Sequence, residues 1–181
     1  MSAFSQASVN TIRVVTMLTK DGSTIILGAT MRCGVGPSFV DNWSAGGVAV
    51  GIDIESGRLK KFAFDKEGHK YTEHPTTRTL FENFPIPEWK AIIDIAHRIQ
   101  RIFPWYRLLG LDIALQENAI PTLIEVNDST DLLFQEQTSG PLLLRSPVLR
   151  AFGQYDLLIN KHQKKLYAAL SKATDERRPA D

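Results

Sequence analysis

Three oxygen-bearing side chains follow one another on two short apolar segments late in the chain: Asp112 on the first, Glu125 and Asn127 on the second. Successive side chains of a β-strand point to opposite faces, so Leu123, Glu125 and Asn127 are expected to share one face. A carboxylate and an amide would then lie side by side on a strand. The plain alternative is the solvent-facing edge of a half-buried sheet.

The spacing predicts that the two segments pair. If they form a hairpin centred on Asn118-Ala119, Asp112 lies directly opposite Glu125. Opposed like charges destabilise a sheet unless a cation compensates them, and carboxylate and amide oxygens suit Mg²⁺ or Mn²⁺. The pattern therefore predicts a metal site, whereas a register slip of one residue or a bulge at Pro121 would separate the acids and leave an ordinary edge.

Two arginines early in the chain are candidates for holding phosphate. Arg13 interrupts a β-branched segment and shares a strand face with Thr11, and Arg32 ends the next such segment. A guanidinium on a strand can bind a phosphate oxygen in bidentate geometry. The alternative for each arginine is a surface ion pair or an apolar stem lying along the surface.

Residues 41–47, "DNWSAGG", have the composition of a loop that brings backbone close to a ligand. Gly46 and Gly47 remove side-chain bulk, and Asn42 offers a polar contact. The alternative is an ordinary turn anchored by Trp43.

The remaining reactive residue types give weaker signals. His74 precedes Pro75 in a polar turn, which by itself favours a solvated loop histidine. The other histidines are scattered and suggest no zinc cluster, and Cys33 has no partner histidine that would make it a nucleophile. Glycines 34 and 36 fit neither a Walker loop nor a dinucleotide fingerprint.

Composition limits the partners. The 181 residues include 21 Lys+Arg and 20 Asp+Glu, a formal net charge of +1, so there is no global reason to propose nucleic acid or an anionic membrane as a partner. A lone cysteine, no apolar run of membrane-spanning length and no signal-peptide pattern favour a cytoplasmic protein.

These residues need a scaffold of strands and helices. The pattern predicts an α+β fold, a mostly antiparallel sheet flanked by helices, with a hairpin turn at Asp21-Gly22. The expected strands are 11–19, 24–32, 48–56, 58–65, 69–74 and a hairpin within 108–127, and the expected helices are 86–103 and 148–172. We expect one domain over 9–173, with 1–8 disordered or facing a partner and 174–181 a disordered tail.

Several of these motifs resemble a known superfamily. "GLDIAL" followed by "LIEVN" is similar to the C-terminal part of an ATP-grasp domain, where an acid on one strand and a Glu-x-Asn on the next hold Mg²⁺ between the phosphates of ATP. "NTIRVVT", "RCGVGPSFVDNWSAGG", "EHPTT" and "FPIPEW" resemble its sugar-transfer-associated branch. The resemblance spans roughly residues 9–133.

This resemblance implies ATP and Mg²⁺ or Mn²⁺ as cofactors and a carboxylate ligase as the activity. Such enzymes transfer the γ-phosphoryl group of ATP to a small-molecule carboxylate, and an amine or other nucleophile then attacks the acyl phosphate. By resemblance, Arg13 contacts the terminal phosphate, Arg32 lies near the transferred group, His74 lines the substrate side, and the metal ligands are Asp112, Glu125 and Asn127.

The sequence departs from the family pattern at its start. A complete ATP-grasp domain has a preceding lobe with a phosphate-binding lysine and an adenine-binding hinge, and residues 1–13 come too late for either. We therefore expect the phosphate- and metal-binding half of a ligase, completed by a partner chain or a homodimer that covers the exposed face. The alternative is a non-catalytic ligand-binding or scaffold module.

Overall fold

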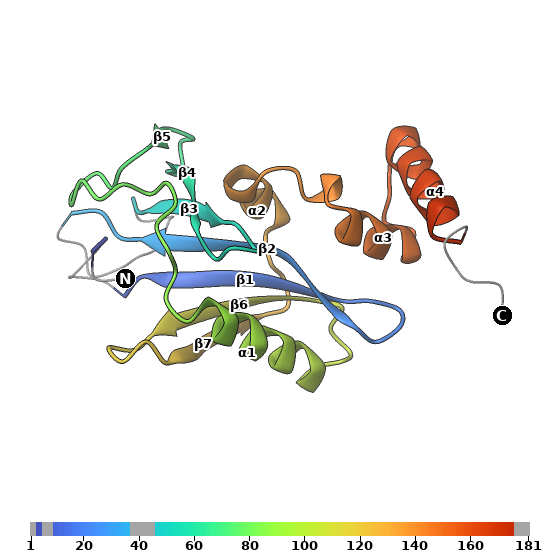
Figure 1. Cartoon of the computed structure of the whole chain (residues 1–181), viewed down its shortest axis with the longest axis horizontal. Coiled ribbons are helices and arrows are strands. Elements are labelled where there is room, and N and C mark those ends of the chain that lie inside the picture. The colour runs from blue at the N-terminus through green and yellow to red at the C-terminus, as the bar shows by residue number, and fades with distance from the viewer. Residues whose placement is uncertain (1–2, 5–8, 37–45, 176–181) are drawn as a thin grey trace.

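The computed structural model describes residues 3–4, 9–36 and 46–175. Within them, the strands form one antiparallel sheet in the order β5-β4-β3-β2-β1-β6-β7 (Figure 1). The predicted α+β class with a mostly antiparallel sheet flanked by helices is confirmed. The strands are β1 (Thr11–Leu18), β2 (Thr24–Cys33), β3 (Val48–Ile52), β4 (Leu59–Phe64), β5 (Lys70–Tyr71), β6 (Leu108–Leu115) and β7 (Pro121–Asn127).

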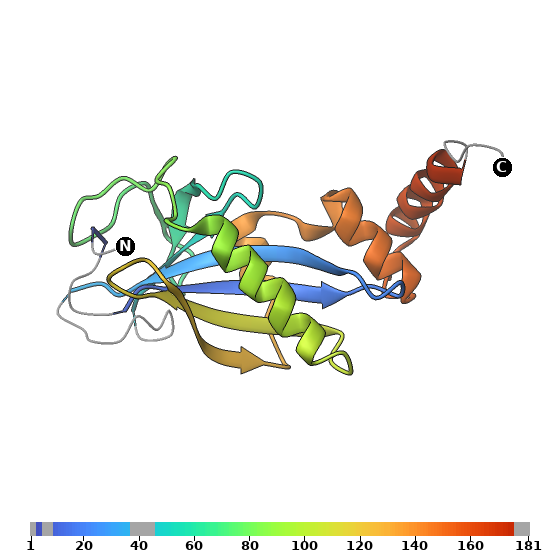
Figure 2. The same cartoon turned by 60° about the horizontal axis from the view of Figure 1, so that its bottom comes forward.

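One face of the sheet is covered by α1 (Trp89–Ile102), which crosses it diagonally in Figure 2. Ile92 and Ala96 are fully buried in the main core, as the helical spacing predicts. At the end of the helix Ile102 is exposed, whereas the polar Gln100 is buried. The Gln100 amide accepts a hydrogen bond from Thr16 and donates one to a backbone carbonyl, which satisfies it in the core.

The opposite face carries α2 (Leu132–Ser139), the short 3-10 helix η2 (Leu142–Leu144) and α3 (Ser146–Gln154). A second apolar cluster joins β1 and β2 to η2 and α3. Thr30 of β2 and Thr138 of α2 share a 2.7 Å hydrogen bond, and Gly51 of β3 leaves room for the α2 backbone at Thr138. α2 was not predicted from the sequence.

The C-terminal helix is broken in two, which corrects the single helix expected over 148–172. α3 ends at Gln154, Asp156 adopts a left-handed conformation with φ 56°, and α4 begins at Lys161 and runs to Asp175. Asn160 and Gln163 cap the new helix reciprocally, because the Asn160 side chain accepts from the Gln163 N–H and the Gln163 side chain accepts from the Asn160 N–H. None of the described helices is long and apolar enough to cross a bilayer.

Candidate functional site

A row of charged side chains crosses three neighbouring strands. Arg13 of β1 is the register partner of Asp112 on β6, and Asp112 is the register partner of Glu125 on β7. The predicted opposition of the two acids is confirmed. Asp112 is only 3% exposed, whereas Glu125 lies at the exposed edge strand.

Both predicted arginines converge on the buried acid. The Arg13 Nε and Nη2 groups donate to the two oxygens of Asp112, and each donor–acceptor distance is 2.6 Å. The Arg32 Nη2 lies 2.9 Å from Asp112 Oδ2. Arg32 also donates to the Thr11 hydroxyl, because the β1–β2 register places these two residues opposite each other. Each arginine is thus in an ion pair, as the alternative interpretation predicted. The ion pair is mostly buried within the sheet and does not lie on the surface.

The protein supplies its own counter-charge at this point. The hydrogen bond with Asp112 raises the pKa of Arg13; burial opposes this shift, and the nearby Glu125 and Asp131 carboxylates add to it. The opposed acids therefore do not by themselves require a metal ion, and that step of the sequence argument is wrong. The metal-binding roles of Asp112, Glu125 and Asn127 stay a prediction.

A β-bulge at Ile124 sets the geometry of β7. The pairing passes from Asp112 opposite Glu125 to Ile113 opposite Leu123, which leaves Ile124 without a partner in the ladder. Leu123 consequently packs against the main core. Alternation predicted that Leu123 and Glu125 share a face, and this prediction is wrong because the bulge turns Leu123 to the other face. The bulge lies at Ile124 rather than Pro121, and it leaves the two acids opposed.

Two buried polar groups lie beside the row without a partner. Within the described residues, the Asn127 side-chain nitrogen and the Thr130 hydroxyl are buried and make no hydrogen bond. Asn127 is opposite Gly110, and a side chain at Gly110 would collide with Thr130, so both groups lie over the same small residue. Buried polar groups are normally satisfied, so this pair indicates a place for an external polar ligand.

The residues present fit a hard cation. Glu125 offers carboxylate oxygens, Asn127 an amide that can turn its oxygen inward, and Thr130 a hydroxyl. Both oxygens of Asp112 are bonded to the arginines, so Asp112 becomes a ligand only when they release it. The sequence analysis missed Thr130. The signal that could have identified Thr130 is the polar run directly after Asn127, which continues the strand's polar face into a loop.

Asp131 links this loop to α2. Its carboxylate caps the helix by accepting the N–H groups of Leu133 and Phe134 over 2.9 and 3.2 Å. The same carboxylate contributes to the raised pKa of Arg13, so the beginning of α2 lies near the arginines.

The predicted glycine loop is only partly described. Asn42 lies outside the described residues. Gly46 has φ +93° and open space where a side chain would point, and Gly47 is buried directly before β3. Because β3 pairs with the end of β2 that carries Arg32, Gly47 lies toward the same end of the sheet as the arginines. Its ligand-binding role stays a prediction.

His74 is not a solvated loop histidine, since it is 1% exposed. Its Nε2 lies 3.0 Å from the Gly34 carbonyl, and its Nδ1 accepts from the N–H groups of Thr76 and Thr77. The ring is therefore held as the neutral Nε2–H tautomer, and burial lowers its pKa. It fixes the backbone just after β2, and its place on the substrate side stays a prediction.

Comparison with known proteins adds one finding. A family model described as sugar-transfer associated ATP-grasp matches residues 1–150, a span that holds the whole sheet, both arginines and the loop to α2. No curated protein and no solved structure matches the chain.

Proposed function

Because the chain belongs to the sugar-transfer associated ATP-grasp family, we propose that it provides the metal- and phosphate-binding part of an ATP-dependent carboxylate ligase. The family indicates a ligase-like, ATP-dependent function, and the charged row across β1, β6 and β7 is the part of this chain suited to it. The observation that carries the proposal is the convergence of Arg13 and Arg32 on Asp112, beside two buried polar groups without a partner.

The charges of this patch suit a nucleotide held with a cation. Arg13 lies near three carboxylates, those of Asp112, Glu125 and Asp131, and Arg32 pairs with the first of them, so acids outnumber arginines and the patch attracts a cation. A triphosphate offers Arg13 new acceptors in the bidentate geometry that Asp112 now provides, and it offers Arg32 an acceptor in place of its single contact with Asp112. Release of Asp112 from the arginines then frees its oxygens, so anion and cation favour each other's binding.

The proposed reaction is carboxylate activation. An oxygen of the substrate carboxylate attacks the γ-phosphorus of ATP, and the bond to the bridging oxygen breaks, so that ADP leaves with that electron pair. An amine or other nucleophile then attacks the acyl carbon, and phosphate leaves. Arg13 and Arg32 hold the phosphate oxygens on which negative charge develops. A magnesium or manganese ion held by Asp112, Glu125 and Asn127 supplies further charge neutralisation.

One observation favours a second candidate, a ligand-binding module without catalysis. Asp112 already accepts two hydrogen bonds from Arg13 and forms an ion pair with Arg32, and such a cluster can be retained for structure alone. In that case the chain binds nucleotide or another phosphate compound without transferring a group.

Calorimetric titration tests the binding step. The chain is titrated with a non-hydrolysable ATP analogue, with and without Mg²⁺, and compared with Glu125→Gln, Arg32→Gln and the control Glu117→Gln. Glu125 and Glu117 are both exposed, one in the charged row and one in the hairpin turn, so neither change should affect folding. We expect magnesium-dependent binding that weakens about tenfold in Glu125→Gln and Arg32→Gln but not in the control. Absence of binding by the unmodified chain, or equal binding by all variants, refutes the proposal.

Hydroxylamine trapping separates the two candidates. Acyl phosphates react with hydroxylamine to give hydroxamates, so incubation with ATP, Mg²⁺ and a panel of small carboxylates reports activation directly. Hydroxamate formation supports the ligase, whereas nucleotide binding without any hydroxamate means that the chain on its own acts as a binding module.

A further inference from the structure

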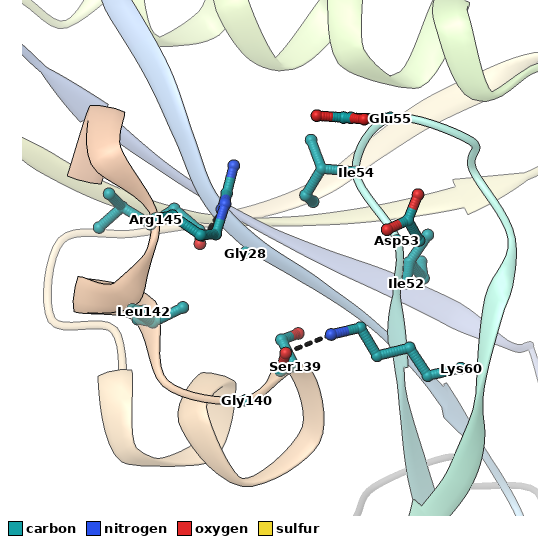
Figure 3. Close-up of a pocket in the computed structure, with 11 residues that line it drawn as sticks. Gly28, Ile52, Asp53, Ile54, Glu55, Lys60, Ser139, Gly140, Leu142 and Arg145 are labelled. Carbon is teal, nitrogen blue, oxygen red and sulfur yellow. Dashed lines mark hydrogen bonds between the residues drawn. The ribbon is translucent and has the colours of Figure 1, made fainter. Parts of the chain in front are cut away.

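A cavity lies on the α2 face of the sheet, at the end of α2 far from Asp131. It has a volume of about 290 Å³ and opens between the end of α2, η2 and the loop from β3 to β4 (Figure 3). Gly28 of β2 forms part of its floor, with the apolar Leu27, Ile52 and Leu142 around it. The size is at the lower end of small-molecule sites.

Two cations line the cavity, Arg145 after η2 and Lys60 of β4. The Arg145 Nη1 donates to the carbonyls of Ile26 and Leu27 over 3.1 and 2.7 Å, while its Nε and Nη2 make no hydrogen bond within the described residues. Lys60 donates to the Ser139 carbonyl at the end of α2 and so neutralises the negative end of that helix. The half-buried guanidinium thus keeps two donor groups available for a ligand.

Two carboxylates also line the cavity. Asp53 and Glu55 lie across the cavity from Arg145 in Figure 3. Burial lowers the pKa of Arg145, and these two acids partly offset that effect, although neither forms an ion pair with it within the described residues. Asp53 accepts from the Ser56 N–H and hydroxyl through Oδ1, which leaves its second oxygen available.

We propose that this cavity binds a small zwitterion of the α-amino acid class. The ligand carboxylate would take the two available donors of Arg145, and its ammonium group would lie between Asp53 and Glu55. The apolar floor takes a short side chain. Two cations and two acids leave no net charge, which disfavours a simple anion or a simple cation and favours a dipolar molecule.

The cavity and the charged row are at opposite ends of one helix. Asp131 at the beginning of α2 lies near Arg13, whereas Ser139 at its end lines the cavity. The proposal therefore does not depend on the proposed function and stands or falls on its own test.

Amide NMR titration of the ¹⁵N-labelled chain provides that test. The probes are L-alanine, acetate and methylammonium, each added at constant ionic strength, and the reporters are the backbone amides of Gly28, Gly140 and Ile54. We expect L-alanine to shift these amides with millimolar affinity, and acetate and methylammonium to bind at least about tenfold more weakly. Glu55→Gln should weaken L-alanine binding about tenfold, whereas the control Glu117→Gln should not.

Glu55 and Glu117 are both exposed, so both variants should fold. Arg145→Lys keeps the charge but loses the planar pair of donors, and it should also weaken L-alanine binding. If acetate binds as tightly as L-alanine and methylammonium does not, the cavity is an anion site. If methylammonium binds as tightly as L-alanine and acetate does not, it is a cation site. Either result, or no shift up to about 50 mM L-alanine, overturns the proposal.

Discussion

Arg13 and Asp112 lie directly opposite each other on neighbouring strands and are joined by two parallel hydrogen bonds of 2.6 Å. Arg32 approaches the same carboxylate from β2, so one buried acid holds two arginines from two strands. The arrangement connects β6 to both strands of the first hairpin. It also means that the groups proposed to bind phosphate are already ordered before any ligand arrives.

Removal of the acid should be costly. Asp112→Asn leaves two mostly buried guanidinium groups without their counter-charge, and we expect a loss of about 3 kcal/mol in the free energy of unfolding. Urea denaturation measures it. The control Glu117→Gln should change stability by less than about 0.5 kcal/mol.

A double variant tests the cause of that loss. Adding Arg13→Gln to Asp112→Asn removes one of the stranded cations, so the double variant should be less destabilised than the two single effects predict together. Strict additivity would show that the pair contributes nothing through its charges.

The register of this site was predictable because it depends on local patterns. Alternation of apolar and polar residues and the Asp21-Gly22 turn are enough to place β1 and β2. A hairpin centred on Asn118-Ala119 gives the correct partner for Asp112. The bulge at Ile124 and the register shift between Val15 and Thr16 were not predicted, because an unpaired residue leaves no mark on composition.

The contacts between distant segments were not predictable. Arg13 and Asp112 are 99 residues apart, and nothing in either strand alone indicates that the acid is neutralised by arginine rather than by metal. α2 was missed because its eight residues bury only Phe134, Gln135 and Thr138, too few for a helical period. The cap at Asp131 was the available signal for α2. No sequence signal indicated that His74 is buried.

The buried histidine should make stability depend on pH. Burial lowers the pKa of His74 below its usual 6.5, so the unfolded chain binds this proton more readily than the folded one. Its contribution is therefore fully present above pH 6.5 and is lost as the pH falls toward the folded pKa. We expect the urea midpoint to fall over that window in the unmodified chain and to change less in His74→Asn.

Ring ¹⁵N shifts check the same histidine directly. They should show a protonated Nε2 and a bare Nδ1, as the bonds to Gly34, Thr76 and Thr77 require. The matched control is His162→Asn, which makes the same substitution at an exposed position. A His74 that titrates at or above 6.5 contradicts this account.

Two glycines under α2 should respond differently to the same substitution. A methyl group at Gly51 would overlap the α2 backbone at Thr138, which cannot move without shifting the helix. At Gly28 the nearest atom is the end of the Gln135 side chain, 2.8 Å away, which can turn aside. We expect Gly51→Ala to cost about 3 kcal/mol and Gly28→Ala about 1 kcal/mol in urea denaturation, and similar losses would show that α2 is not seated on β3.

Asp65 in the turn from β4 to β5 should resist protonation. Burial alone would raise its pKa, but hydrogen bonds from the His69 ring, the His69 N–H and the Tyr71 hydroxyl lower it to about 2. Since the folded pKa lies below the unfolded value of about 3.9, its contribution to stability is present above that pH and is lost between about pH 4 and pH 2. Carboxyl ¹³C shifts measured across this range should place the Asp65 transition near pH 2, and Asp65→Asn should flatten the acid limb of the stability curve. Titration near 4 would mean that the His69 and Tyr71 hydrogen bonds do not hold the carboxylate in solution.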